Sequence, residues 1–404
     1  MGVQLDKIFD NFSKNTLFKD KFVLQSNYSP ESIPHREKQI EQVATILAPT
    51  LRGERSSNLF VYGGTGTGKT LSTLYVKNEM IKRAKQENVS LKIEYLNCKM
   101  KKVSDTEYRI LAELIKKLGG SVPATGLPTD QVYNKFIELI ESEKQLVILV
   151  LDEVDQAVNK ISDNFLYNLT RLNSELSKSQ ISIVGISNDL KFLESLDPRV
   201  RSSLGEEELI FPPYNAVQLQ DILKNRAEEA FKPNILEDGV ISKCAAYAAR
   251  EHGDARRALD LLRVAGEIAE REGCDKVKLE HVDHANEKID KDKIISFIES
   301  APKQFQLVLL AVINLIERNR GEKIEKIFTG DVYNIYNELC TKNKIEILTQ
   351  RRVSDIIAEF DMLGVITANV ISKGRHGRTR EIKLAIPKQV VEKVRNVLLE
   401  SLVL

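Results

Sequence analysis

The sequence predicts an α/β protein in which a parallel sheet is sandwiched between helices and is followed by a small helical domain and a C-terminal winged helix. Three observations support this prediction. Before Pro212-Pro213, short apolar runs alternate with helical segments, which is typical of a parallel sheet with right-handed crossovers. After this dipeptide the chain shows only helical periodicity for one domain length. The C-terminal part then has three helical segments and two β-type runs, the layout of a winged helix.

The chain is long enough for several domains. Its 404 residues exceed the size that one hydrophobic core usually reaches, so we expect roughly two to four domains. The pattern predicts a polar N-terminal tail at 1–28, a base domain with the sheet at 29–212, a helical domain at 213–291 and a winged-helix domain at 292–404.

Each element is placed by the spacing of its apolar residues. The strands at 146–151 and 181–186 are almost continuous Val, Ile and Leu, which is typical of strands buried on both faces of a sheet. The expected strands are 59–62, 93–96, 146–151, 181–186, 365–371 and 380–386. The expected helices are 35–51, 69–86, 104–118, 129–142, 163–177, 304–320, 328–342 and 349–361, with a lysine-rich linker helix at 289–303.

A glycine-rich motif follows the first strand and precedes a helix. It matches G-x-x-x-x-G-K-[ST], in which glycines let backbone N–H groups curl around phosphate oxygens. The helix that begins at Lys69 points its positive dipole end at the same place. We expect Lys69 to bridge the β- and γ-phosphates of ATP and Thr70 to bind Mg²⁺. The motif comprises Gly63, Gly64, Thr65, Gly66, Thr67, Gly68, Lys69 and Thr70.

Acidic and amide side chains end two later strands. Asp152 and Glu153 follow the strand at 146–151, where a carboxylate faces the phosphate crevice of such a sheet. We expect Asp152 to orient Mg²⁺ or its water shell, and Glu153 to polarise the attacking water as general base. Asn188 follows the strand at 181–186 and would sense the γ-phosphate or position water, although asparagine is also an ordinary turn residue.

Charge and cysteine content limit the classes of function. The net charge is +1, but residues 293–404 hold 18 Lys/Arg against 13 Asp/Glu, a net charge of +5 that points toward nucleic acid. The four cysteines form no Cys-x-x-Cys pair, so we expect neither a zinc site nor a redox motif. No apolar run has membrane-spanning length and the N-terminus lacks the apolar region of a secretory signal. We therefore expect a cytoplasmic, nucleoid-associated protein without a membrane partner.

The order of these motifs resembles a known group. A phosphate loop followed by Asp152-Glu153 and Ser187-Asn188 is similar to an AAA+ ATPase. The segments 197–204 (DPRVRSSL) and 253–259 (GDARRAL) and the winged helix narrow the resemblance to the archaeal origin-recognition initiators. These are related to the eukaryotic origin-recognition subunit one and cell-division-cycle six proteins. The resemblance implies an AAA+ parallel sheet sandwich with a helical lid, and a C-terminal winged-helix domain that binds DNA.

The resemblance also implies further site residues near the nucleotide. Arg256, on the lid, matches the second sensor, an arginine that reaches the γ-phosphate. Tyr214 and Arg226 match positions near the bound adenine nucleotide. Arg199 and Arg201 lie where AAA+ proteins carry an arginine finger that acts in trans, and the sequence does not choose between them.

Contact with DNA is predicted in three places. The helix at 349–361 would enter the major groove, as in other winged helices, and the basic hairpin tip suits the minor groove. Residues 104–128 lie where initiators carry an additional helix and loop that contact DNA. The expected DNA-contacting residues are Gln350, Arg351, Arg352 and Ser354 on the helix, and Lys373, Arg375, His376, Arg378 and Arg380 on the hairpin.

The function that the resemblance implies is replication initiation. Such a protein binds ATP and ADP with Mg²⁺, recognises replication origins in double-stranded DNA, hydrolyses ATP slowly as a switch and helps to load the replicative helicase. A paralogous initiator is a further expected partner. The alternative is a transcription regulator switched by ATP, or another AAA+ ATPase associated with DNA. The winged helix argues against a clamp loader, which would carry a helical collar instead.

Overall fold

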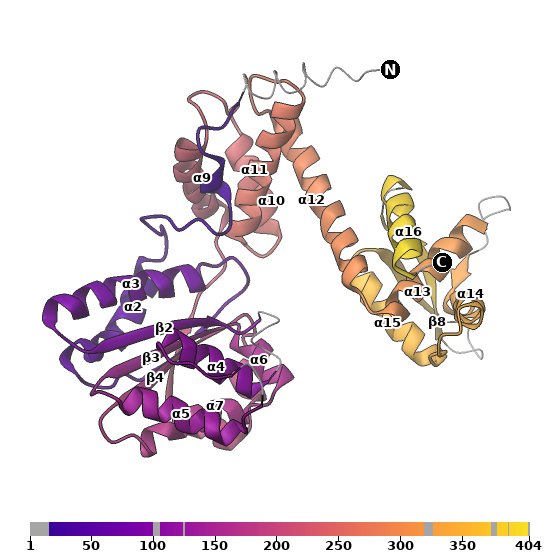
Figure 1. Cartoon of the computed structure of the whole chain (residues 1–404). Coiled ribbons are helices and arrows are strands. Elements are labelled where there is room, and N and C mark those ends of the chain that lie inside the picture. Colours follow the sequence, from indigo (N-terminus) through magenta and orange to yellow (C-terminus); the bar gives the residue numbers. More distant parts are fainter. Residues whose placement is uncertain are drawn as a thin grey trace. The chain divides into compact units, whose positions relative to one another are not determined.

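A computed structural model describes residues 16–99, 106–123, 126–318, 326–372, 378–386 and 388–402 of the chain. Two compact units make up the structure, residues 1–283 and 284–404, and each has hydrophobic clusters of its own (Figure 1). The boundary falls inside α12 (Leu279–Ser300), one continuous helix that includes most of the predicted linker helix.

The first unit contains a five-stranded parallel sheet. All four strands predicted for this unit are present, and the spatial order is β2-β3-β4-β1-β5. The fifth strand, β5, was not predicted, because only Leu209 is buried in its glutamate-rich sequence and it lies at the sheet edge. The strands are β1 (Asn58–Tyr62), β2 (Leu91–Asn97), β3 (Leu146–Asp152), β4 (Gln180–Ser187) and β5 (Glu206–Ile210).

Helices cover both faces of this sheet, as Figure 1 shows. Alternate strand residues point to opposite faces, so Leu59 and Val61 pack in the cluster with α2 and α3, whereas Phe60 packs in the cluster with α4 to α8. β3 is buried along its whole length, as predicted for a strand with two covered faces. The helices are α2 (Glu37–Leu47), α3 (Lys69–Glu87), α4 (Glu107–Lys117), α5 (Thr129–Glu141), α6 (Val154–Lys160), α7 (Asn164–Arg171) and α8 (Pro198–Leu204), with short 3₁₀ turns at Ala48–Arg52, Leu172–Ser174 and Phe192–Ser195.

A helical lid completes the first unit. It contains α9 (Ala216–Ala230), α10 (Val240–Arg250) and α11 (Ala255–Arg271). Asn215 caps α9 in a capping box with Gln218, and Asp254 caps α11 by accepting from two backbone N–H groups. These polar caps start both helices beside the base domain.

The described part of the predicted N-terminal tail is packed on the lid, which corrects the expectation of a tail there. Phe18 is buried and stacks on Phe231, with ring centroids 4.6 Å apart. The backbone N–H of Lys19 donates to the carbonyl oxygen of Ala230 (2.8 Å), and a 3₁₀ turn follows at Lys21–Leu24. Phe18, one of the scattered aromatic residues of this polar stretch, is therefore an anchor on the lid. We call residues 16–34 the N-terminal segment.

The second unit has the predicted winged-helix layout. Three helices pack around a shared core and precede a β-hairpin, and α16 packs against α13. Two elements were not predicted: the two-residue strand β6, which pairs with β8, and α16. The elements are α13 (Lys303–Arg318), β6 (Ile327–Phe328), α14 (Thr329–Lys342), α15 (Gln350–Met362), β7 (Ile366–Ser372), β8 (Arg378–Leu384) and α16 (Lys388–Leu402).

Candidate functional site

The ends of three central strands lie level at one edge of the sheet. The register pairs Tyr62 with Ser187, and Asp152 with Ile186. Because parallel strands end on the same side, the loops after β1, β3 and β4 converge there. The phosphate loop, the acidic pair and Asn188 were predicted from three separate stretches of sequence, and the sheet brings them together.

The phosphate loop joins β1 to α3 and contacts the lid. Helix α3 begins at Lys69, as predicted. Gly66 has a φ of +69°, and a Cβ on it would collide with the Asp254 carboxylate of the lid. The backbone N–H of Ala255 donates to the carbonyl oxygen of Gly66 at 3.2 Å. Glycine is therefore required at this position both for the left-handed backbone and for the close approach of the lid.

Lys69 is almost completely buried within this loop. Its Nζ donates to the carbonyl oxygens of Gly63 (2.7 Å) and Gly64 (2.8 Å), and to Asn188 Oδ1 (2.9 Å). Burial lowers the pKa of Lys69 to about 8, although the nearby Asp152 carboxylate acts in the opposite direction. The ammonium group is thus held mainly by neutral acceptors, an arrangement that favours an incoming anion.

Asp152 is buried and accepts three hydrogen bonds. Its Oδ2 accepts from Thr70 Oγ1 (3.0 Å) and from the hydroxyl of Tyr95 (2.7 Å), while Oδ1 accepts from the backbone N–H of Glu153 (2.9 Å). Thr70 and Asp152 are therefore adjacent, as expected for two residues that share one metal ion. Tyr95 was not predicted, because a tyrosine within a β-strand is indistinguishable in sequence from an ordinary sheet residue.

Glu153 has an unusual backbone for a non-glycine residue. Its φ is +53°, in the left-handed region, directly before α6. Its carboxylate is 3.2 Å from Lys99 Nζ, and its side chain is 21% exposed. Residues held in this conformation cluster at functional sites, because the surrounding structure must stabilise the strain.

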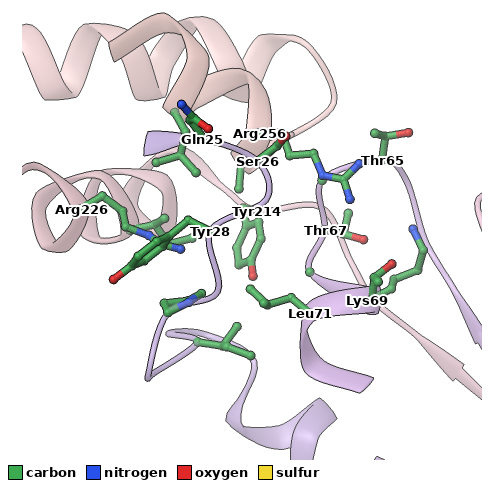
Figure 2. Close-up of a pocket in the computed structure, with 18 of the residues that line it drawn as sticks. Gln25, Ser26, Tyr28, Thr65, Thr67, Lys69, Leu71, Tyr214, Arg226 and Arg256 are labelled. Carbon is green, nitrogen blue, oxygen red and sulfur yellow. The ribbon is translucent and has the colours of Figure 1, made fainter. Parts of the chain in front are cut away.

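A cavity of about 630 Å³ lies between the base and the lid. Figure 2 shows Arg256 extending from the lid toward Thr65 of the phosphate loop, with Tyr28 and Arg226 at the other end of the cavity. All the predicted nucleotide-site residues except Gly63 and Gly64 line this cavity. The lining includes Thr65, Gly66, Thr67, Gly68, Lys69, Thr70, Asp152, Glu153, Asn188, Tyr214, Arg226 and Arg256, together with Tyr95 and most of residues 25–34.

The end of the cavity away from the phosphate loop is aromatic and basic. The Arg226 guanidinium lies over the Tyr28 ring, 4.5 Å from its centroid, and the Tyr28 hydroxyl donates to Glu229 at 2.8 Å. Arg226 is 8% exposed, its Nη1 lacks a hydrogen-bond partner among the described residues, and burial lowers its pKa. The N-terminal segment thus supplies one wall of the site, which the sequence did not indicate.

Arg36 is a second residue that the sequence did not indicate. It is 1% exposed, and its Nε donates to the carbonyl oxygen of Thr67 at 2.8 Å, while Nη2 donates to that of Pro212. Its guanidinium lies 3.7 Å from the centroid of the Tyr214 ring. Arg36 therefore connects the phosphate loop to the hinge between base and lid. An arginine before a helix carries no sign in the sequence that it will be buried.

The two arginine-finger candidates differ in their surroundings. The Arg199 guanidinium donates two hydrogen bonds to Asp197, both 3.1 Å long, although the Arg199 side chain is 85% exposed. Arg201 is also exposed, and it has no ion pair within the part of the chain that the structure describes. Both lie on α8, outside the residues that line the cavity.

A cluster of three potential metal ligands lies in the lid. The donor atoms of Glu272, Cys274 and His281 are within 4.8 Å of one another. However, His281 Nδ1 accepts a hydrogen bond from the backbone N–H of Lys278 (2.9 Å), so the neutral ring carries its proton on Nε2, which lies 3.2 Å from Glu272. A protonated Nε2 has no lone pair for a metal. His281 instead connects the start of α12 to Glu272 through the hydrogen bonds of its two ring nitrogens.

The predicted recognition helix α15 has the expected two faces. Val353, Ile356, Ile357 and Phe360 are buried in the core of the second unit. Thr349 caps the helix by accepting from the backbone N–H of Arg352, and the amino-terminal turn is exposed to solvent. The exposed predicted DNA-contacting residues in this turn are Gln350, Arg351 and Arg352, and Ser354 is half-buried.

The hairpin is described only in part. β7 pairs with β8 in antiparallel register, with Ser372 opposite Arg378, and Arg380 is half-buried on β8. Lys373, Arg375 and His376 lie outside the described residues.

In the first unit, the apolar face of α4 packs into the core, and the Tyr108 hydroxyl donates to the carbonyl oxygen of Pro123 (2.6 Å).

Three family models match consecutive parts of the chain. An AAA domain matches residues 52–192, a Cdc6 AAA+ ATPase-type lid domain matches 220–287 and a CDC6 C-terminal winged helix domain matches 296–394. Among curated proteins, the chain is 51% identical to the ORC1-type DNA replication protein 1 of Methanosarcina mazei, covering 98% of this chain and 94% of that protein. It is also 51% identical to the ORC1-type DNA replication protein of Pyrococcus abyssi, covering 98% and 93%.

Solved structures give the same result. The chain is 44% identical to the Aeropyrum pernix ORC1 protein, whose structure was solved in complex with DNA, with a TM-score of 0.81 and coverage of 95% of this chain and 97% of that one. The structure of Cdc6p from Pyrobaculum aerophilum is 20% identical with a TM-score of 0.60, covers 96% and 99%, and supports the fold. Among the described residues, no helix combines the length and apolar character needed to cross a membrane.

Proposed function

Because the chain belongs to the family of ORC1-type DNA replication proteins, we propose that it is an ATP-switched initiator that binds duplex DNA at replication origins. The observation that carries this proposal is the cavity between base and lid. Lys69, Thr70 and Asp152 meet Arg256 across it, so one bound nucleotide would contact both parts. Lid position and nucleotide state would then depend on each other.

ATP with Mg²⁺ is the ligand that suits these residues. The phosphate loop and Lys69 would hold the β- and γ-phosphates, and the aromatic and basic end of the cavity would hold the adenosine. Thr70 and Asp152 offer hard oxygen donors, the type that Mg²⁺ prefers. When bound, the ion would neutralise charge on the phosphate chain.

Slow hydrolysis would serve as the switch. Glu153 would take a proton from the attacking water, and Asn188 would hold that water or the γ-phosphate. Arg256 would stabilise the γ-phosphate charge only when the lid is closed over it. Hydrolysis would thus remove the γ-phosphate that holds the lid closed through Arg256. The resulting movement of the lid would change how the protein contacts a partner.

The winged helix is the proposed DNA reader. Its exposed amino-terminal turn carries Gln350, Arg351 and Arg352, which suit base edges and phosphates in the major groove. The Aeropyrum pernix relative was solved in complex with DNA, which supports DNA binding by this chain. Contacts by the hairpin, by residues 104–128, with a paralogous initiator and with the replicative helicase belong to the same proposal, as does an association with the nucleoid.

The nucleotide assignment is tested by two substitutions and a control. Lys69→Ala should abolish most ATP binding measured by calorimetry, because it removes the phosphate contact. Glu153→Gln should retain ATP binding but slow single-turnover hydrolysis by roughly a hundredfold or more, because the general base is lost. Lys82→Ala, an exposed lysine on the same helix, is the control. ATP binding by Lys69→Ala at the parental affinity would contradict the assignment.

Lid coupling is tested by Arg256→Ala. Hydrolysis should fall more than ATP affinity, because the arginine contributes mainly in the closed state. Equal losses in both would indicate a structural role.

Footprinting across the genome separates an initiator from a transcription regulator. Occupancy at one or two repeat-containing loci supports the initiator, and occupancy of many promoters supports the regulator.

A further inference from the structure

Tyr95 lies on the edge strand β2 and reaches the adjacent strand. The register pairs it with Val150, two residues before Asp152, so both side chains lie on the same face of the sheet. Tyr95 packs against the apolar cluster that includes residues of α2 and α3, and it also lines the nucleotide cavity. Its hydroxyl donates to Asp152 Oδ2 at 2.7 Å.

Two hydroxyl groups converge on this one oxygen. Thr70 also donates to Asp152 Oδ2, at 3.0 Å, so the single proton of its hydroxyl points at the carboxylate and its lone pairs remain free for a cation. A tyrosine hydroxyl is ordinarily protonated throughout the physiological range, so Tyr95 acts as the donor in its hydrogen bond to Asp152.

Tyr95 limits the ways in which the carboxylate can turn. The terminal torsion of an aspartate is broad, so a carboxylate with few partners can rotate. Of the three described donors to Asp152, Thr70 and Tyr95 donate to Oδ2 and Glu153 donates to Oδ1. Without the Tyr95 hydroxyl, Oδ2 would therefore keep only the hydrogen bond from Thr70. Outer partners of this kind orient the groups that hold a metal and commonly change metal affinity when they are removed.

We propose that Tyr95 is a positioning residue for the magnesium site, fixing the Asp152 carboxylate in the orientation that Mg²⁺ bound with ATP requires. This inference rests on the proposed ATP–Mg²⁺ function and adds to it a residue from β2.

The test is the Mg²⁺ dependence of ATP binding by the full chain. Tyr95→Phe removes one oxygen and retains the packed ring. The Mg²⁺ concentration for half-maximal ATP binding should rise about tenfold or more in this variant, while ATP affinity in EDTA should equal that of the parent. In an Asp152→Asn background, Tyr95→Phe should cause no further change in Mg²⁺ dependence, because the group that it orients has been altered.

Tyr133→Phe is a matched control. Tyr133 is another half-buried tyrosine of the first unit that donates to a carboxylate, Glu107, and it does not line the cavity. Its removal should leave both binding measurements unchanged. The proposal would be overturned if Tyr95→Phe left the half-maximal Mg²⁺ concentration unchanged or lowered it. Equal losses of ATP affinity with Mg²⁺ and with EDTA would also overturn it. If Lys69→Ala abolishes ATP binding while Tyr95→Phe matches the parent, only this inference fails; if the parent does not bind ATP, the proposed function fails.

Discussion

The burial of Lys69 in the phosphate loop lowers the pKa of its ammonium group. In the free protein its pKa is about 8, so the ammonium group loses its proton as the pH rises through that value. A bound phosphate chain would stabilise the charged form and raise the pKa again. Nucleotide binding above about pH 8 should therefore be coupled to proton uptake.

We expect ATP affinity to be nearly independent of this group below about pH 7 and to fall above about pH 8, by at most tenfold per pH unit. Calorimetry at several pH values, in two buffers with different ionisation enthalpies, measures both the affinity and the proton uptake. Lys82→Ala, which alters an exposed lysine of the same helix, should behave like the parent in both measurements. A parental protein without proton uptake at about pH 9 would contradict the prediction.

The lowered pKa of Lys69 has the opposite effect on the stability of the free protein, which rises with pH where ATP affinity falls. The folded pKa of Lys69 lies below its ordinary value of 10.5, so the unfolded chain binds more protons between about pH 8 and 10.5. This group alone therefore makes the folded state more stable as the pH rises through that window. A lysine at this position costs stability at neutral pH, which is consistent with a functional role.

At the scale of elements, the N-terminal segment is anchored to the lid by one aromatic side chain. Phe18 stacks on Phe231, and both rings lie against Gly266, where an added Cβ would collide with them. Nearby residues of the segment line the nucleotide cavity. Packing of this segment on the lid thus also positions the residues that form the aromatic and basic end of the cavity.

Phe18→Ala should destabilise the lid by about 3 kcal/mol, because it leaves a cavity at a buried aromatic contact. Hydrogen exchange measured by mass spectrometry should show protection in α9 and α11 falling by roughly a hundredfold. Phe22→Ala, four residues further along and 47% exposed, should change protection little. Similar behaviour of the two variants would show that Phe18 is not an anchor.

The winged-helix elements are expected to bind DNA in two ways that salt can separate. Arg375→Ala and Arg378→Ala should weaken binding to every duplex and reduce the salt slope by about 0.9 for each phosphate that is no longer neutralised. Arg352→Ala or Gln350→Ala should instead change the preference between duplexes, by roughly 1–3 kcal/mol at the base pair concerned.

Titrations of a specific and a scrambled duplex at several salt concentrations distinguish these effects. Arg375 could also be sequence-selective through the width of the minor groove, in which case its removal would affect the two duplexes unequally. An Arg375→Ala/Arg378→Ala variant with parental affinity and slope on both duplexes would exclude the hairpin from DNA binding.

At the scale of the molecule, the chain has two units with separate cores. The second unit has a core of its own, built from α13 to α16 and the hairpin strands. We expect a fragment of residues 279–404, which keeps α12 whole, to fold and to bind duplex DNA alone. Its affinity should be lower than that of the full chain, by roughly a hundredfold, if the first unit also contacts DNA.

Circular dichroism and DNA titration of this fragment check the prediction. A folded fragment that does not bind DNA would assign binding to the first unit or to both units together. Full affinity in the fragment would exclude residues 104–128 as a contact.

Local constraints explain what the sequence alone determined. The phosphate loop can be recognised because its conformation requires glycine at given positions, and Asp152 because it ends a strand of uniformly apolar residues. The predicted strands of the parallel sheet and the winged-helix order follow from periodicity, which each segment carries by itself. Family membership follows from the order of these motifs along the chain.

Tertiary structure decided the features that depend on contacts between distant residues. Arg36, Tyr95 and Phe18 have ordinary neighbours in sequence, and only packing makes one a buried link to the hinge, one a partner of Asp152 and one an anchor. β5 and β6 became strands by pairing at sheet edges, although β5 is rich in glutamate and β6 has only two residues. Burial and pairing are properties of pairs of distant segments, so no single stretch of the chain can encode them.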